Sequence, residues 1–546
     1  MRRFAAATLV CLALAVLHTW PIASEPQRHS LNYNADAELN AWIVSWIAYA
    51  LPHEPRRLFA GNIFQPDDRA LAYSEPLVVP ALAGAPIRWM GGSAVLTFNL
   101  LLIAGLAATG AATWMVAARW TGSFTGGLVA AALAAFNTHL LTRLPHLQAA
   151  HAWGLPLVLY LTDLLLAQDA PTRRCLPTIV ALGLVIAATA ATSEYWLFFA
   201  AVLMAVQVVV GARSRRVLGH VALAGGIGGM LALPVLMPYL RLAGEGVRRP
   251  LEQAAQLSAT PWGYLTSLSR LDALWSHRFF TRDIDVLFPG IAATLLAVVG
   301  LVAALRAGGP ARRRGVALVA IAVLGVVMSL GPATPLYPLA YRVVVPLQGL
   351  RVPARFGYLA LLAVALLAGY GVAALQRRLT SPWRSAAGAL ALCAVTVEAW
   401  HGPVKTTPFT GVPRIYSVLS QEPPGSLLVE APFWPAEAVF GNAEYVLNAT
   451  EHRTPTMNGY SGFTPDAYRR RAQWFWFFPE PWAIAAMRRE GATHVMVHLE
   501  QFGPEATSVK RALESQSALQ LIAEDPLGHR LYRFRAGAES EAGGKR

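Results

Sequence analysis

Charged residues are scarce in this sequence. Asp, Glu, Lys and Arg make up 14% of its 546 residues, whereas a soluble globular domain contains about 25%. Hydrophobic residues make up 55%. Because so few charges could not cover the surface of a soluble protein of this length, we expect much of the surface to contact lipid.

Lysine is almost absent. It occurs only at Lys405, Lys510 and Lys545, so Arg supplies nearly all of the cations behind the net charge of +14. A basic balance is also typical of nucleic-acid-binding proteins, but many of these arginines lie in short stretches between apolar runs. That placement indicates membrane topology, and we expect no nucleic-acid partner.

Cysteines are few, and nucleotide-binding motifs are absent from the sequence. Cys11, Cys175 and Cys393 are too few and too scattered for a disulfide framework or a metal knuckle. The sequence has neither a GxxxxGK[ST] loop nor a GxGxxG after a strand, and it has no Ser-centred nucleophile elbow. These absences argue against a nucleotide-dependent enzyme and against a serine hydrolase.

Long apolar runs fill the first 401 residues. A helix needs roughly 20 mostly apolar residues to cross a bilayer. The predicted membrane helices are 4–22, 94–118, 124–138, 152–168, 176–192, 195–211, 217–240, 286–305, 315–331, 357–376 and 385–401. The first run is also compatible with a cleaved signal peptide, but no A-x-A site follows Trp20 and Pro21, so we predict an anchored helix.

The arginines between these runs predict the orientation. With the N-terminus in the cytoplasm, every inside loop is short and carries Arg, as the positive-inside rule requires. The inside arginines are Arg119, Arg173, Arg174, Arg213, Arg215, Arg216, Arg306, Arg312, Arg313, Arg314, Arg377, Arg378 and Arg384. The long outer loops are then 23–93, 139–151, 241–285 and 332–356. Since Ala- and Arg-rich usage is typical of bacteria, we predict a multi-pass protein of the inner membrane.

Two domains and a tail are predicted. Residues 1–401 form an all-α polytopic bundle of about eleven transmembrane helices. Residues 402–535 form an extracytoplasmic α+β soluble domain, because an odd helix count places them outside. Its strand-like runs are Ser426–Glu430, His494–His498, Gln520–Ala523 and Leu531–Phe534, and its helical stretches are Pro481–Glu490 and Glu505–Ser515. The Gly-, Glu- and Ser-rich residues 536–546 predict a disordered tail.

The first outer loop carries a pair of carboxylates, Asp36 and Glu38, at the start of a Trp-bearing amphipathic pattern. The apolar residues at helical spacing are Leu39, Trp42, Ile43, Trp46, Ile47 and Ala50, which favours a helix lying flat in the membrane interface. Positions two apart do not share a helix face, so we take Asp36 as the acting group and Glu38 as secondary. The equal alternative is that Asn34 or Asp36 only caps the helix.

This layout resembles the GT-C superfamily of membrane glycosyltransferases. Its members have a many-spanning bundle, an acidic residue in a long first outer loop followed by interface-lying helices, and often a soluble C-terminal domain. Residues 350–361 (LRVPARFGYLAL) and 458–465 (NGYSGFTP) are similar to segments of YfhO-like bacterial members. The acidic pair here is Asp-Ala-Glu, whereas some members have adjacent Asp-Asp or Asp-Glu.

The resemblance implies transfer of a sugar from a polyprenyl-phosphate carrier to an acceptor hydroxyl at the outer face. A carboxylate such as Asp36 would accept the proton of that hydroxyl, and the acceptor would be a glycan, a lipid or a protein. Two other classes stay open: a transporter or flippase for lipid-linked envelope precursors, and a non-catalytic envelope assembly protein. Helix cores nearly free of charge argue against ion-coupled transport.

Four arginines of the outer loops are candidates to bind the donor phosphate: Arg248, Arg249, Arg351 and Arg355. A planar guanidinium binds phosphate through two parallel hydrogen bonds. Arg351 and Arg355 flank Pro353 just before a predicted membrane helix. The alternative for these two is interfacial snorkelling or contact with lipid headgroups.

The second outer loop offers histidines. The resemblance implies that this loop helps to bind a metal or the donor phosphate, and His139, His146 and Asp36 could together hold a divalent metal ion. Otherwise each histidine only forms hydrogen bonds at the interface. His151 is a candidate substrate-binding residue. Glu194, at the next turn between helices, is a third candidate catalytic carboxylate or a polar turn residue.

In the C-terminal region, Asn458 and Tyr460 lie on a loop punctuated by Gly and Pro. The resemblance implies that this loop covers the membrane cavity and contacts substrate. The aromatic run at 474–478 follows three arginines at 469–471. Sugar stacking, anchoring to the bilayer surface and core packing all remain open for it.

Overall fold

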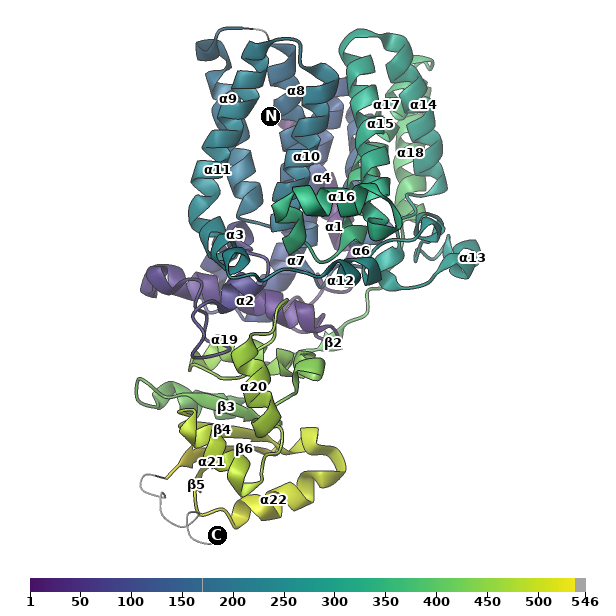
Figure 1. The fold of residues 1–546 in the computed structure, drawn as a ribbon. Coiled ribbons are helices and arrows are strands. Elements are labelled where there is room, and N and C mark those ends of the chain that lie inside the picture. The colour runs from purple at the N-terminus through teal and green to yellow at the C-terminus, as the bar shows by residue number, and fades with distance from the viewer. Residues whose placement is uncertain (169, 536–546) are drawn as a thin grey trace. The chain divides into compact units, whose positions relative to one another are not determined.

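The computed structural model describes residues 1–168 and 170–535 (Figure 1), and the predicted tail at 536–546 lies outside them. The chain divides into two compact units. Unit 1 comprises Met1–Pro26, Pro76–Pro80 and Asn99–Lys405. Unit 2 comprises Gln27–Glu75, Ala81–Phe98 and the described chain from Thr406 onward. The predicted domain boundary near 402 therefore lies close to the boundary at Thr406, but most of the first outer loop belongs to unit 2.

Unit 1 is a bundle of long apolar helices that run side by side (Figure 1). A helix occupies each segment predicted to cross the membrane. These helices are α1 (Arg2–His18), α4 (Ala94–Thr121), α5 (Phe124–Ala135), α8 (Gly154–Ala167), α9 (Thr172–Ala190), α10 (Glu194–Gly211), α11 (Arg215–Gly244), α14 (Ile291–Ala307), α15 (Gly309–Ser329), α17 (Gly357–Arg377) and α18 (Trp383–Glu398). The shorter helices are α6 (Thr138–Leu141), α7 (Leu147–Ala150), α12 (Leu251–Gln256), α13 (Ala273–Ser276) and α16 (Leu336–Val343).

Six segments of the described chain are long and apolar enough to cross a membrane. They are Ala94–Thr121, Leu147–Ala167, Thr172–Ala190, Glu194–Gly211, Arg215–Gly244 and Pro353–Arg377. The helices α5 and α14 are apolar but have only 12 and 17 residues. The membrane-protein prediction is thus confirmed, and the full number of crossings stays a prediction.

Helix α17 is the centre of the second half of this bundle. Its backbone approaches that of α14 so closely that a Cβ at Gly300 would lie 1.8 Å from the Leu367 carbonyl oxygen. A Cβ at Gly371 would likewise lie 2.0 Å from the Leu296 carbonyl oxygen. Small residues at such contacts let membrane helices pack backbone to backbone.

Two carboxylates of unit 1 have structural partners. Asp163 of α8 is 1% exposed and lies 2.7 Å from guanidinium nitrogens of both Arg313 and Arg314 of α15. Glu398, at the end of α18, accepts the N–H groups of Ile291 and Ala292. This cap satisfies the first turn of α14, which explains why α14 begins at Ile291 instead of at the predicted residue 286.

Unit 2 is built around a four-stranded sheet with the order β3-β4-β6-β5. Strands β3 (Leu428–Ala431) and β4 (His494–His498) are parallel, and the other neighbours are antiparallel. The other two strands are β5 (Leu519–Glu524) and β6 (His529–Phe534). Each of the four strands overlaps one predicted strand-like run. The remaining elements are α2 (Ala35–His53), most of α3 (Val78–Trp89), α19 (Ala443–His452), α20 (Asp466–Phe475), α21 (Pro481–Arg489), α22 (Ala506–Glu514) and the pair β1 (His29–Ser30) and β2 (Thr407–Pro408).

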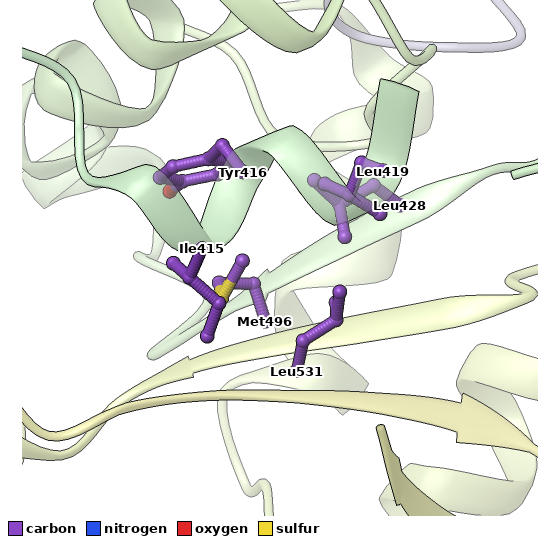
Figure 2. Close-up of a cluster of buried hydrophobic side chains, with 6 residues drawn as sticks. All are labelled: Ile415, Tyr416, Leu419, Leu428, Met496 and Leu531. Carbon is purple, nitrogen blue, oxygen red and sulfur yellow. The ribbon is translucent and has the colours of Figure 1, made fainter. Parts of the chain in front are cut away.

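An apolar cluster joins the sheet to the 3₁₀ helix η9 (Arg414–Gln421) (Figure 2). The helix contributes Ile415, Tyr416 and Leu419. The sheet contributes the buried side chains of Leu428, Met496 and Leu531. These side chains come from three successive strands, so the cluster forms the core beneath η9.

The first outer loop is held to the C-terminal region by backbone hydrogen bonds. The Phe64 N–H donates to the Asn458 carbonyl and the Gln65 N–H to the Thr456 carbonyl, both at 2.9 Å. The Thr456 N–H donates to the Asn62 carbonyl at 2.8 Å. On the other side of this segment, the Met457 N–H donates to the Leu428 carbonyl of β3. Residues 62–65 therefore continue the backbone hydrogen bonding that begins at β3.

Side chains strengthen this connection. The Trp42 indole N–H of α2 donates to Asn62 Oδ1 at 2.9 Å, and Asn62 Nδ2 donates to the Ala449 carbonyl of α19 at 3.0 Å. A Cβ at Gly459 would lie 2.6 Å from the Phe64 ring, so only glycine fits there without a shift. Helix α2, predicted as amphipathic, has its central residues 37–48 buried on all sides.

Candidate functional site

Asp36 lies in the first turn of α2. The cap of this helix is Asn34, whose Oδ1 accepts the Asp36 N–H at 2.9 Å. The half-buried Asp36 carboxylate instead accepts a hydrogen bond from the Tyr460 hydroxyl, with Oδ1 and Oη 2.9 Å apart. Of the two capping candidates, the cap is therefore Asn34, and the Asp36 side chain is oriented by a phenol.

Asn458 supports the loop that carries Tyr460. It is fully buried, its Oδ1 accepts the Glu430 N–H at 2.8 Å, and its Nδ2 donates to the Glu430 carbonyl and to Asn442 Oδ1. Both ends of the amide are thus occupied by protein groups. This position favours a supporting role for Asn458 over the predicted contact with substrate.

Glu38 lies in a different environment from Asp36. It is 7% exposed, and burial, followed by the nearby Glu444 carboxylate, raises its pKa to about 8. At pH 7 only about a tenth of a carboxyl with such a pKa is ionised. A protonated carboxyl cannot accept a proton, so Glu38 is poorly suited to act as a base at neutral pH.

The pocket in unit 1 gathers several of the predicted residues. His139, Arg143, His146, Tyr195 and Arg355 line a cavity of about 30 Å³ together with Leu140, Gln148, Ala149, Ser193, Trp196 and Tyr358. This volume holds a water molecule or two but no sugar. In this conformation the pocket is a small, mainly apolar cavity with two arginines, Arg143 and Arg355, in its wall.

Of the predicted phosphate-binding arginines, Arg355 lines this pocket. The Arg355 guanidinium lies 4.4 Å from the centre of the Tyr195 ring, and the Tyr195 hydroxyl accepts the Val352 N–H at 2.8 Å. Burial and the Arg351 cation lower the pKa of Arg249, while Tyr195 and Glu194 act in the opposite direction.

Arg249 therefore lies near Arg351, Tyr195 and Glu194, and Arg355 lies over the Tyr195 ring. Arg248, in contrast, is exposed. Tyr195 was not predicted. Its only sequence signal is its place directly after Glu194 at a helix start.

His139 and His146 have cationic neighbours. His139 Nδ1 lies 3.1 Å from the Val286 carbonyl oxygen. Burial, and next the Arg143 cation, lower the pKa of His139 to about 3, so its imidazole is neutral at pH 7 and donates to that carbonyl. With Arg143 and Arg355 in the same wall, the pocket favours an anion over the predicted divalent metal.

His151 packs between helices. Its Nε2 lies 3.0 Å from the Leu101 carbonyl oxygen, and a Cβ at Gly105 would lie 2.5 Å from its ring. The side chain is 7% exposed. This environment fits helix packing better than the predicted contact with substrate.

The aromatic run at 474–478 divides between core and surface. Phe475 and Phe478 are buried, whereas Trp474, Trp476 and Phe477 are about half exposed. The run thus contributes to the core and also presents aromatic rings to the outside. Another group of unit 2, at the end of β4, brings together two histidines and a glutamate of the kind that hold metals.

Similar proteins are found only among solved structures, since no protein-family model and no curated protein matches the chain. Arabinofuranosyltransferase AftD from Mycobacteria matches with a TM-score of 0.61 at 17% identity, covering 98% of this chain and 40% of AftD. The oligosaccharyltransferase AglB from Archaeoglobus fulgidus, solved with an inhibitory peptide and a dolichol-phosphate, matches with a TM-score of 0.53 at 13% identity, covering 98% and 74%. The chain thus spans about two fifths of the length of AftD, and at these identities the likeness shows the fold.

We expect a pH-dependent stability from Glu38. A folded-state pKa above the unfolded value of 4.5 means that its contribution is full below about pH 4.5 and is lost as the pH rises to about 8. Relative to wild type, Glu38→Gln should gain up to about 1.4 kcal/mol of unfolding free energy per pH unit across that window.

Thermal unfolding of the detergent-solubilised protein between pH 5 and pH 9 measures this change. Glu54→Gln, at the other end of α2, is the matched control for loss of a carboxylate. A constant offset between Glu38→Gln and wild type at every pH would show that Glu38 does not titrate in this window.

Proposed function

Because the chain has the fold of the GT-C membrane glycosyltransferases, we propose that it transfers a sugar from a polyprenyl-phosphate carrier to an acceptor hydroxyl. We place this reaction at the outer face of a bacterial inner membrane, with the N-terminus in the cytoplasm and the C-terminal region outside. We also propose that, within this superfamily, the chain is related to the YfhO-like bacterial proteins. The acceptor is a glycan, a lipid or a protein.

The observation that carries the proposal is the orientation of Asp36 by Tyr460 in a chain with this fold. In the reaction, the Asp36 carboxylate accepts the proton of the acceptor hydroxyl while the acceptor oxygen bonds to the anomeric carbon. The bond from that carbon to the carrier phosphate breaks, and the phosphate leaves with the electron pair. A hydrogen bond that fixes one carboxylate oxygen reduces the orientations that the base must search.

The arginines supply the second requirement of this chemistry. Negative charge develops on the leaving phosphate, and preorganised cations stabilise such charge most where water is excluded. The Arg351 cation lies close enough to Arg249 to lower the pKa of Arg249, after the larger effect of burial. Two guanidinium groups held near one another repel, and an anion between them relieves that repulsion, which supports a phosphate as their ligand.

Substitution of Asp36 tests the base. We expect Asp36→Asn to lower the rate of sugar transfer at least about a hundredfold, because a positioned acid or base contributes about 10² to 10⁴. Tyr460→Phe should lower it by about ten- to a hundredfold, since a hydrogen bond to a charged group contributes about 1.5–3 kcal/mol. The assay uses purified membranes with a panel of polyprenyl-phosphate sugars.

Asp68→Asn is the matched control, because Asp68 is an exposed carboxylate of the same loop. Equal membrane insertion of all variants is checked first. Transfer by Asp36→Asn at the wild-type rate would remove Asp36 from the mechanism and direct attention to Glu194. Transport of a lipid-linked precursor without transfer would contradict the enzyme itself.

Removal of Arg351 tests the phosphate site. We expect Arg351→Gln to lower kcat/KM for the lipid-linked donor by about ten- to a hundredfold, through loss of a charge-assisted hydrogen bond. It should weaken inhibition by free polyprenyl phosphate by a similar factor. Arg342→Gln, an exposed arginine of α16, is the control, and equal inhibition of Arg351→Gln and wild type would contradict the assignment.

A further inference from the structure

The end of β4 brings together His498, Glu500 and His529. His498 is the last residue of β4, and the strand register places it opposite His529, the first residue of β6. Their rings are edge to face, with centroids 4.9 Å apart. Glu500 follows two residues after His498, in the 3₁₀ helix η11 (Leu499–Glu505), so the fold itself sets the spacing of all three side chains.

The distances among these side chains are close to those between the ligands of one metal ion, so a small adjustment of the side chains would bring all three onto it. His529 Nε2 lies 3.3 Å and His498 Nδ1 lies 3.7 Å from Glu500 Oε1. One ligand atom from each residue falls within 4.8 Å of the others. Tetrahedral Zn²⁺, with bonds of about 2.0–2.1 Å, requires ligand atoms roughly 3.3–3.4 Å apart.

His498 carries a buried nitrogen that the protein leaves without a hydrogen bond. Its side chain is 1% exposed, and among the described residues Nδ1 has no hydrogen-bond partner. Glu500 at 3.7 Å is too distant for such a bond. The other ring nitrogen, Nε2, lies 2.7 Å from the buried Glu430 carboxylate. A proton on Nε2 leaves a lone pair on Nδ1, which near a carboxylate is repulsive unless a cation lies between them.

His529 is oriented in the same way. Its Nδ1 lies 2.7 Å from Asp525 Oδ2, so the nitrogen opposite Glu500 is bound by a second carboxylate. Both imidazoles therefore have a carboxylate at the nitrogen that faces away from the cluster. Metal-binding histidines characteristically have this arrangement, because the carboxylate fixes the tautomer and the ring.

We propose that His498, Glu500 and His529 bind one Zn²⁺ ion, with water in the fourth position. Two imidazoles and one carboxylate suit Zn²⁺ among the common divalent cations. The half-exposed Glu500 gives the ion access from solvent. The ion ties the end of β4 to the start of β6 and to η11, and it belongs to unit 2 independently of the transfer reaction proposed above.

Titration of the full-length protein with Zn²⁺ alone tests this site. The protein is purified in detergent with a tag free of histidine, treated with a chelator, and studied by calorimetry and by metal analysis. We expect one tightly bound equivalent, lost in His498→Asn and in Glu500→Gln. His494→Asn, in the same strand and beside its own carboxylate Glu422, should retain it.

Asp525→Asn separates a ligand site from a merely structural cluster. It leaves all three ligands in place, and loss of a carboxylate behind a metal-bound histidine lowers affinity about 10–100-fold. Co²⁺ in place of Zn²⁺ should give the absorption bands of tetrahedral Co²⁺ in wild type and in Asp525→Asn, but not in His498→Asn. Circular dichroism confirms that each variant is folded.

Absence of a bound equivalent in folded wild type would overturn the proposal, and so would undiminished binding by His498→Asn. An equivalent lost only in His139→Asn or His146→Asn would place the ion in unit 1 and would also overturn it. If folded wild type binds no equivalent, the cluster is instead a hydrogen-bonded network in which His529 lies between the carboxylates of Glu500 and Asp525. Since no sugar donor is used, failure here is distinct from failure of the transfer assay.

Discussion

The backbone hydrogen bonds between residues 62–65 and 456–458 are the constraint on which unit 2 depends. They join two segments that lie almost 400 residues apart in the chain and continue the hydrogen bonding of β3. Gly459 allows the close approach, and Asn458 locks the loop to Glu430. As a consequence the Tyr460 hydroxyl reaches the carboxylate of Asp36, and the first outer loop folds as part of the C-terminal region.

Asp36 and Glu38 lie in different local environments although they are only two residues apart. Both lie in the first turn of α2, but helical geometry turns them to different sides. Asp36 is half buried and hydrogen-bonded by a phenol, whereas Glu38 is buried near another carboxylate and its pKa rises to about 8. At neutral pH, therefore, Glu38 is mostly protonated and lacks the ionised form that a general base requires.

Local sequence patterns located most helices and strands, but they did not indicate which distant segments pair with one another. Apolar run length located the helices of unit 1, and strand-like runs located β3 to β6. The choice of Asp36 over Glu38 as the acting group, and of Arg351 and Arg355 as phosphate ligands, stays a prediction. Neither the pairing of 62–65 with 456–458 nor the meeting of Glu500 with His529 has a local signature, because both depend on strand register. The burial of the Asn458 and His151 side chains among protein groups likewise has no local sequence signature.

Hydrogen exchange of the backbone amides tests the central claim most directly. Peptides covering 62–65 and 456–458 are compared between wild type and Gly459→Val, whose side chain would displace the Phe64 ring. If the two segments form one cooperative unit, both lose protection together in the variant while β4 and β6 keep theirs. Retained protection of 62–65 beside a deprotected 456–458 would show that the first loop folds by itself, and would contradict the account.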